Sequence, residues 1–387
     1  MDTPAGTTTA YLDHAATSPP RREVLEAVWP YLTSVTGNPS SAHAVGRAAK
    51  AGLDAARGAV ADVLGARPGE VVFTAGGTEA DNLAVTGIAT ANPRGRHVVV
   101  SAVEHPAVLE TAYALRDSGF TVDVVGVDAE GRVDLAELER LLRPDTTLVS
   151  VMYANNEIGT VQPLPEIAAL CHRSGIPLHT DAVQAAGHLD LDVDRLGVDA
   201  LSASAHKFGG LRGAGFLWVR GSVPLAPVLH GGGQELGRRS GTSDVASAVG
   251  TAVALHLAAT ARAVEVPRLQ ALRDRLVDGV LASVPGARLT GSRTHRLPGH
   301  ASFCFEGVGG ETVLAELEAV GIVCSSGSAC AAGSDDASHV LLATGLSADV
   351  ARTAVRFTLG TGSSDDDVDR VLAELPAAVL AAGALRT

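Results

Sequence analysis

The stretch Leu201–Gly215, LSASAHKFGGLRGAG, passes from a short apolar run to a His-Lys pair and then into a turn rich in glycine. Residues 201–204 are small and apolar enough for a buried strand, and Lys207 follows three residues later. Lysine is usually a solvated surface residue, whereas Lys207 lies among Ser, Ala, His and Phe. An amine in such surroundings can have a lowered pKa and act as a nucleophile. The alternative is an ordinary strand end with a solvated lysine, and the rest of the chain decides between the two.

Upstream of Lys207, short β-branched runs alternate with amphipathic runs. This alternation is typical of an α/β domain with a mostly parallel sheet and right-handed crossovers. Such a sheet binds ligands at the carboxyl ends of its strands. We expect strands at residues 71–73, 97–101, 121–127, 147–154, 177–180 and 201–204, and helices at 21–32, 44–64, 79–89, 106–118, 134–142 and 165–174.

The pattern changes after Gly221. A long Ala-rich helical stretch is expected at about residues 244–281, and a closing helix at 365–382. Two strand-like runs, 301–305 and 354–359, lie between them. No repeat or biased linker divides the chain. We therefore expect a large domain of residues 14–255 and a smaller α+β domain of residues 1–13 and 256–387.

The composition limits the class of protein. The chain has 387 residues, 46% of them hydrophobic, so it can bury a large core. Its formal charge is −13, which argues against direct nucleic-acid binding because that needs a basic face. No basic region followed by an apolar region opens the chain, so no signal peptide is predicted. The most apolar run, 248–261, is shorter than a membrane span, and we expect a cytoplasmic protein without a membrane partner.

Four cysteines, Cys171, Cys304, Cys324 and Cys330, are too few for a disulfide framework and form no C-x-x-C pair. No metal site is predicted from their spacing. In a reducing compartment, a cysteine without a disulfide or metal partner keeps a thiol that is available for chemistry.

The segment TAGGTEADN, residues 74–82, follows one expected strand and opens a helix. Its glycines, Gly77 among them, let a ligand approach the backbone, and Thr78 is expected to cap the helix. Free N–H groups and the helix dipole favour a phosphate there. The segment matches neither the ATP-type nor the dinucleotide glycine motif, so a small phosphorylated cofactor fits better. A simple capped turn is the alternative.

Polar residues follow several neighbouring strands. His105 comes after the strand at 97–101, Asn156 after the strand at 147–154, and Asp181 after the strand at 177–180. Each has a plain alternative: His105 precedes Pro106 and can open a helix, and Asp181 can cap one. Together with Lys207 and the phosphate loop they match the needs of pyridoxal phosphate, which are a Schiff-base lysine, an anion site and a pyridinium partner.

Motifs in the same order extend from YLDHAAT at residues 11–17 to VRFTLGTGSSDDDVD at 355–369. Between them lie GNPSSAHAVGR, FTAGGTEADNLA, EHPAVL, YANNEIGTVQP, DAVQAAG, SASAHKFGG, GGGQELGRRSGT and SSGSACAAG. With these motifs the chain resembles the cysteine desulfurases of the NifS/IscS type, which are fold-type-I pyridoxal-phosphate enzymes of the class-V aminotransferase family. The resemblance implies a large domain with a mostly parallel seven-stranded sheet and a smaller α+β domain that carries a cysteine loop at about residues 324–335.

The resemblance also implies a role for each matched residue. Lys207 resembles the Schiff-base lysine that also moves the substrate Cα proton, and His105 the histidine stacked on the cofactor ring. Asp181 is implied to pair with the pyridinium nitrogen, and Arg356 to bind the substrate carboxylate with a planar fork. The remaining implied contacts are Gln184 to the ring hydroxyl, Asn156 to cofactor and substrate, Gly77, Thr78, Ser204 and His206 to the phosphate, and Thr242 to the phosphate of a partner subunit in a homodimer.

Cys330 is the implied sulfur carrier. Its neighbours, residues 325–333, are small and polar, as a thiolate on a mobile loop requires. A structural cysteine is expected among large apolar residues, as Cys304 is between two phenylalanines. Cys324 fits the structural role better than Cys330 does.

The implied activity converts L-cysteine to L-alanine and leaves the sulfur as a persulfide on Cys330. The acceptor stays open between iron–sulfur cluster assembly, tRNA thiolation and other thio-modification. Alternatives are a selenocysteine lyase or an aminotransferase on the same scaffold, and a non-catalytic platform protein of a sulfur pathway. An aminotransferase does not need Cys330, and a platform protein does not need Lys207.

Overall fold

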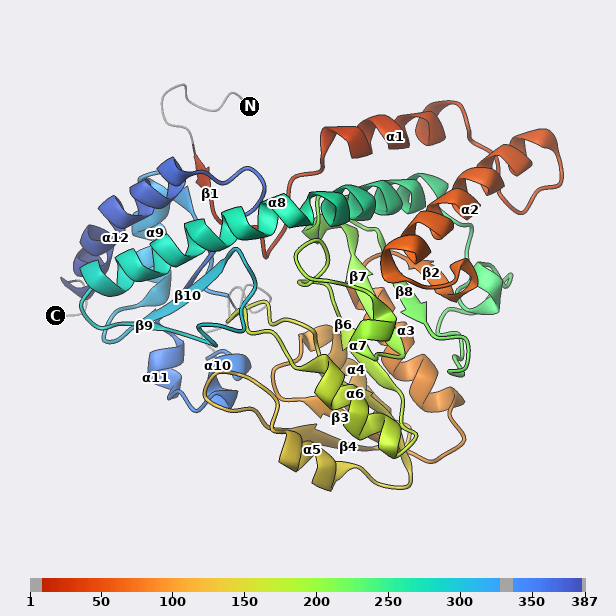
Figure 1. The fold of residues 1–387 in the computed structure, drawn as a ribbon, viewed down its shortest axis with the longest axis horizontal. Coiled ribbons are helices and arrows are strands. Elements are labelled where there is room, and N and C mark those ends of the chain that lie inside the picture. Colours follow the sequence, from red (N-terminus) through yellow and green to blue (C-terminus); the bar gives the residue numbers. More distant parts are fainter. Residues whose placement is uncertain (1–8, 328–336, 385–387) are drawn as a thin grey trace.

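The computed structural model describes residues 9–327 and 337–384, and a seven-stranded sheet forms its centre (Figure 1). The strands are β2 (Val71–Thr74), β3 (His97–Ser101), β4 (Thr121–Val125), β5 (Thr146–Ser150), β6 (Leu178–Asp181), β7 (Ala200–Ser204) and β8 (Gly215–Val219). They lie in the order β2-β8-β7-β6-β5-β3-β4. The strand β8 runs antiparallel to both of its neighbours, β2 and β7, and all other pairs in this sheet are parallel. The predicted α/β class with a mostly parallel sheet is confirmed.

Both faces of this sheet are covered, which explains its apolar strands. All five residues of β3 are buried. Val98 and Val100 point into one core cluster and Val99 into another, because successive side chains of a strand alternate between the faces. On one face lie α3 (Gly77–Ala91) and α4 (Pro106–Asp117), and the other core includes residues of α1 (Arg22–Thr33), α2 (Ala44–Leu64), α5 (Leu135–Leu141), α6 (Leu164–Arg173) and α7 (Val193–Leu196).

A smaller sheet forms a separate core. Its strands are β9 (Ala287–Leu289), β10 (His300–Phe305) and β12 (Ala354–Thr358), in the order β12-β10-β9 and antiparallel. Phe303, Phe305 and Phe357 supply its aromatic packing. The short strands β1 (Ala10–Tyr11) and β11 (Ile322–Val323) pair beside it. The helices of this region are α9 (Gly310–Ala319), α10 (His339–Ala343), α11 (Ala348–Ala351) and α12 (Asp365–Ala384).

The helix α8 (Val245–Ser283) has 39 residues and extends across both regions (Figure 1). Its first half packs with the large core, up to Ala258, and its second half with the small core from Leu269. By length and composition this helix could cross a membrane, although the apolar run at residues 248–261 alone is shorter than a span. Half of its most apolar window is buried inside the protein, as in a core helix. The division at residue 255 falls within α8 and stays a prediction.

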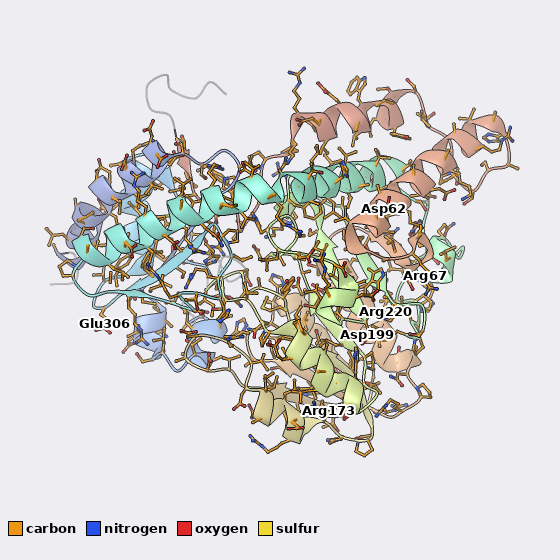
Figure 2. All side chains as sticks on the ribbon, in the orientation of Figure 1. Asp62, Arg67, Arg173, Asp199, Arg220 and Glu306 are labelled. Atoms are coloured by element: carbon orange, nitrogen blue, oxygen red, sulfur yellow. The ribbon has the colours of Figure 1, made fainter. Side chains whose placement is uncertain are left out.

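The strand β8 was not expected from the sequence, because its residues directly continue a glycine-rich turn. It lies between β2 and β7 and is buried along its whole length. Arg220 follows β8 and Asp199 precedes β7, and the two residues join the ends of these neighbours (Figure 2). Arg220 N–H donates to the Asp199 carbonyl at 2.8 Å, and its Nε lies 3.4 Å from Asp199 Oδ1.

Candidate active site

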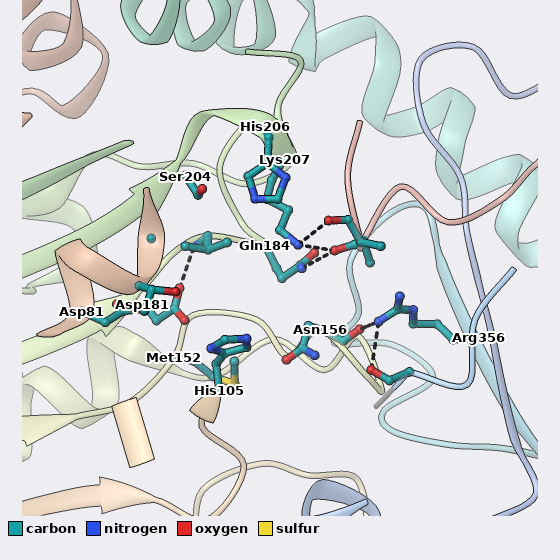
Figure 3. Close-up of a pocket in the computed structure, with 16 residues that line it drawn as sticks. Asp81, His105, Met152, Asn156, Asp181, Gln184, Ser204, His206, Lys207 and Arg356 are labelled. Carbon is teal, nitrogen blue, oxygen red and sulfur yellow. Dashed lines mark hydrogen bonds between the residues drawn. The ribbon is translucent and has the colours of Figure 1, made fainter. Parts of the chain in front are cut away.

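A cavity of about 380 Å³ opens at the carboxyl ends of the parallel strands (Figure 3). His105 follows β3, Asn156 follows β5, and Asp181 and Ser204 end β6 and β7. These strands are neighbours in the sheet, so their ends converge. Ten of the residues predicted from the sequence line this one cavity: Gly77, Thr78, His105, Asn156, Asp181, Gln184, Ser204, His206, Lys207 and Arg356.

Lys207 ends a short 3-10 helix, Ala205–Lys207, directly after β7. Its Nζ donates to the carbonyl oxygens of Ala15 at 2.5 Å and Ala16 at 2.9 Å. The amine therefore points into the cavity rather than into solvent (Figure 3). The chain contains one other lysine, Lys50, which is exposed and pairs with Asp54 on α2.

Asp181 forms part of the cavity wall and is 4% exposed. Its Oδ1 accepts a hydrogen bond from the Val183 N–H at 2.8 Å. Burial raises the pKa of Asp181 above its ordinary value, and the nearby charges of His105 and Lys207 oppose that rise. A buried carboxyl of this kind is a suitable partner for a cationic ring nitrogen, which favours its ionised form.

Asp81 lies beside Asp181 in the same cavity (Figure 3) and was not singled out in the sequence. Burial raises its pKa well above the ordinary value, and the neighbouring carboxyls of Asp181 and Glu104 raise it further. Glu104 is also buried, and burial raises its pKa to about 8. Asp81 lies four residues after Gly77, one turn along α3, and that helical spacing was the available signal.

His179 lies on β6 beneath the cavity, next to Asp81. Its ring nitrogens bond to the hydroxyl oxygens of Ser150 at 2.8 Å and Ser202 at 2.9 Å. Burial lowers the pKa of His179 to about 3, so the ring is neutral. Its Nε2 is 3.8 Å from Asp81 Oδ1, an oxygen with no hydrogen-bond partner among the described residues.

His105 caps a helix and also lines the cavity. It is the N-cap of α4, and its Nδ1 accepts from the Ala107 N–H at 3.0 Å. Its ring also lines the cavity beside Asp181 (Figure 3). Burial lowers the pKa of His105, which favours the neutral imidazole, and the Asp181 carboxylate opposes this shift.

The N-terminus of α3 lies at one end of the cavity, where Gly77 and Thr78 line it. The cap residue is Gly76, with a φ of +131°, and no side chain caps the helix, so the expected cap at Thr78 is wrong. Thr78 is instead the second residue of the helix. The first N–H groups of a helix have no partner within it. A Cβ at Gly77 would lie 2.7 Å from Val183 Cγ2, so any larger residue here would force the wall or the start of α3 to shift.

Cationic and polar side chains surround that helix terminus. Ser204, His206 and Arg212 line an adjoining hollow together with Gly77 and Thr78. His206 Nδ1 lies 3.2 Å from Thr17 Oγ1. Arg212 was not identified in the sequence, because it lies within the glycine-rich turn and forms no pattern there. This donor set fits a phosphate group.

Arg356 lies on β12 and is 2% exposed. Its Nη1 donates to the carbonyl oxygens of Asn156 at 2.9 Å and Gly327 at 3.2 Å, and its Nη2 donates to Asp13 Oδ1 at 2.7 Å. The Nε of Arg356 is buried without a partner among the described residues. The small sheet therefore contributes one cation to a cavity whose other polar side chains follow the strands and helices of the large sheet.

Of the two other predicted residues, only Thr242 is described, and it does not line this cavity. Thr242 is exposed and lines a neighbouring pocket with Glu235 and Arg239. Cys330 lies outside the described residues. Gly327, three residues before it, lines the cavity.

The cysteines within the described ranges are all shielded. Burial raises the pKa of Cys171 and Cys324 to about 12 and that of Cys304 to about 11. None of these three thiols is therefore a ready nucleophile.

The chain is similar to known proteins over nearly its whole length. Residues 10–371 match the family model described as Aminotransferase class-V. A cysteine desulfurase IscS of Methanosarcina thermophila is 46% identical over 368 residues, which are 95% of this chain and 91% of that protein. A solved NifS-like protein superposes with a TM-score of 0.89 at 36% identity over 96% of this chain and 99% of the other. A structure described as SspA in complex with cysteine gives a TM-score of 0.79 at 36% identity, over 91% of this chain and 99% of that one.

Proposed function

The chain belongs to the class-V aminotransferase family, and on that premise we propose that it is a pyridoxal-phosphate-dependent cysteine desulfurase. It converts L-cysteine to L-alanine and retains the sulfur on Cys330 for transfer to an acceptor. The observation that carries this function is the single cavity in which Lys207, His105, Asp181 and Arg356 meet. Relatives named cysteine desulfurase, similar over nearly the whole chain, support the same conclusion.

The cavity has the donors that pyridoxal phosphate requires. Asp181 would hold the ring nitrogen, Lys207 would bind the aldehyde carbon, and Gln184 would bind the ring hydroxyl. Gly77, Thr78, Ser204 and His206 would hold the phosphate at the α3 terminus. When bound, the cofactor supplies an electron sink that stabilises negative charge at the substrate Cα.

The chain's own residues move the protons. With the cofactor and substrate bound, the Lys207 amine would take the proton from the substrate Cα. The His105 ring lines the same cavity and would assist in returning protons to the carbon skeleton. The carbonyls of Ala15 and Ala16 hold the Lys207 Nζ when it carries its proton.

Arg356 and Asn156 would recognise the substrate. Arg356 carries a planar fork of donors that matches a carboxylate, and its Nε still lacks a partner among the described residues. Asn156 lines the cavity between Arg356 and His105 (Figure 3). Together they would hold the α-carboxylate of L-cysteine on the side of the small sheet.

Cys330 is the sulfur carrier in this proposal. Its thiolate forms a bond to the substrate sulfur, the substrate Cβ–S bond breaks, and the carbon skeleton leaves as alanine after protonation. The other three cysteines, all described, have pKa values that burial raises. The position of Gly327 in the cavity wall supports the same assignment, because Cys330 is only three residues away along the chain.

We propose that two copies of the chain form a homodimer. Leu25, Trp29 and Leu32 recur at helical spacing on α1, and each is about half exposed or more. Such an apolar stripe is typical of a buried face. Thr242 is exposed outside the cavity of its own subunit, where it could reach the phosphate bound in the partner subunit.

The acceptor of the sulfur is a protein or thiolation enzyme. The net charge of −13 supports a cytoplasmic enzyme without direct nucleic-acid binding.

The test is mass spectrometry of the holoenzyme after incubation with L-cysteine in the absence of reductant. We expect one added sulfur on the peptide that carries Cys330, together with alanine in solution. In Cys330→Ser the added sulfur disappears, whereas Cys324→Ser, which replaces a partly buried cysteine six residues away, keeps it. Alanine formed without added sulfur in the parent enzyme would indicate a lyase instead. Normal sulfur release by Cys330→Ser would contradict the persulfide mechanism.

A further inference from the structure

Six residues between β1 and α1, Asp13–Ser18 (DHAATS), connect the small sheet to the large one; we call them the N-terminal strap. At its start the His14 N–H donates to the Thr358 carbonyl on β12 at 3.3 Å. At its end the Ser18 N–H donates to the His206 carbonyl at 2.9 Å. The strap therefore bridges the two regions whose side chains meet in the cavity.

The side chain of Asp13 binds Arg356. Its Oδ1 accepts from Arg356 Nη2 at 2.7 Å, and the Asp13 side chain is only 17% exposed. The Tyr11 hydroxyl donates to the Asp13 carbonyl at 3.1 Å and to the Thr17 carbonyl at 2.8 Å. These two contacts fix the backbone of the turn that begins at Asp13, and that turn fixes the position of the Asp13 side chain.

The fork of Arg356 is fixed from two sides. The carbonyls of Asn156 and Gly327 hold Nη1, and Asp13 provides the charged partner of Nη2. A buried guanidinium without a counter-charge is costly. Within the described residues, Asp13 is the carboxylate that forms an ion pair with Arg356.

The backbone of the same strap binds Lys207. The carbonyls of Ala15 and Ala16 accept from its Nζ at 2.5 and 2.9 Å (Figure 3). Gln184 Nε2 donates to the Ala15 carbonyl as well, at 2.9 Å. One short segment therefore fixes both the lysine amine and the arginine that face the cavity.

We propose that Asp13 is a positioning residue for substrate recognition. It orients Arg356 to accept an α-carboxylate, and the strap that it begins sets the distance from that cation to the Lys207 amine. This spacing selects amines that carry a carboxylate on the same carbon. The inference rests on the proposed function only in assigning Arg356 to the substrate carboxylate.

The test compares two ligands that differ by the carboxylate alone, L-alanine and ethylamine. Each is titrated into the holoenzyme, and binding is followed by the change in the cofactor absorbance. We expect Asp13→Ala to weaken L-alanine binding about tenfold or more, which is the effect of losing a charged hydrogen-bond partner. Asp13→Asn keeps an acceptor for Nη2, so we expect a loss of about threefold. Binding of ethylamine stays unchanged in both variants.

The matched control is Asp349→Asn. Asp349 pairs with Arg352 on the surface. Arg352 lies four residues before Arg356 in the chain, so this ion pair is close in sequence to the site, and we expect no change in the binding of either ligand. Unchanged or tighter L-alanine binding by Asp13→Asn and Asp13→Ala would overturn the proposal. An equal loss for both ligands would also overturn it, because it would mean general damage to the cavity. If Asp13→Ala does not fold, Asp13→Asn decides the matter alone.

The two proposals fail in distinguishable ways. Binding of L-alanine needs neither Cys330 nor sulfur transfer. A parent enzyme that forms no persulfide but shows the selective loss in Asp13→Ala would contradict the desulfurase function and support the role of Asp13.

Discussion

Lys207 and Gln184 donate to the same acceptor: the Ala15 carbonyl oxygen lies 2.5 Å from the lysine Nζ and 2.9 Å from the glutamine Nε2. The residue proposed to bind the aldehyde of the cofactor is therefore held beside the one proposed to bind its ring hydroxyl. This shared contact fixes the position of the lysine amine when it is not bonded to a cofactor.

Replacing Lys207 removes the covalent attachment of the cofactor. We expect Lys207→Ala to lose the absorbance band of bound pyridoxal phosphate and at least a thousandfold of the activity, because no other amine lines the cavity among the described residues. Borohydride reduction followed by peptide mass spectrometry measures the attachment. Lys50→Ala, which removes the only other lysine, should keep both the band and the label. A labelled Lys50 would contradict the assignment.

Filling the wall at Gly77 should weaken phosphate binding. In Gly77→Ala the new Cβ would lie 2.7 Å from Val183 Cγ2 and 3.3 Å from Ser204 Cβ, so the start of α3 must shift. We expect the Kd of the apo-enzyme for pyridoxal phosphate to rise about tenfold or more, the effect of losing charge-assisted contacts, and that for pyridoxal to change less. Fluorescence titration measures both. Gly58→Ala, in an open helical position, is the control, and an unchanged Kd in Gly77→Ala would exclude the phosphate site at this terminus.

Buried histidines should make the protein sensitive to acid. Burial lowers the pKa of His179 to about 3 and that of His188 to about 4, from 6.5. Below pH 6.5 the unfolded chain binds protons that the folded chain excludes, so stability falls as the pH drops through this window. Each such histidine contributes up to about 1.4 kcal/mol per pH unit.

Urea unfolding at pH 7, 5.5 and 4.5 measures this dependence. We expect His179→Gln to be less stable at pH 7, because two serine hydroxyls lose their partner, but to show a shallower decline with falling pH. The exposed His256 provides the control, and His256→Gln should leave the slope unchanged. An undiminished slope in His179→Gln would show that this histidine is not the cause.

The apolar stripe on α1 should govern assembly. Trp29 is 65% exposed, and we expect Trp29→Glu to shift the dimer toward monomer, because a carboxylate would be buried without a partner. Sedimentation equilibrium measures the shift. Val264→Glu, at an exposed site on α8, should leave the mass unchanged. A Trp29→Glu protein that remains dimeric would place the interface elsewhere.

Much of the cavity could be predicted because its residues follow strands. His105, Asp181 and Lys207 each come at the end of a β-branched or small apolar run, and parallel neighbours bring such ends together. Residues that do not follow a strand, but reach the site from a helix or through a distant segment, were not marked by this strand pattern. Asp81 lies on a helix one turn beyond the glycines, and Asp13 meets Arg356 across 343 positions of the chain.

The errors have similarly local causes. The strand β8 follows a turn dominated by glycine, so its five apolar residues did not stand out as a separate element. The expected cap at Thr78 failed because the backbone at Gly76 adopts a φ of +131°, which glycine permits and which places the start of the helix earlier. Neither conformation can be deduced from residue type alone.

The continuous helix α8 limits how this chain could be divided by protein engineering. A cut after residue 255 would separate Leu255 from Ala258, although both belong to the large core. A cut after Ser283 would leave Leu269, Leu272 and Leu276, which the small core now covers, facing water on the large fragment. Two fragments produced separately would therefore be expected to aggregate unless they are coexpressed, and insertions of reporter domains are better placed in exposed loops than anywhere along this helix.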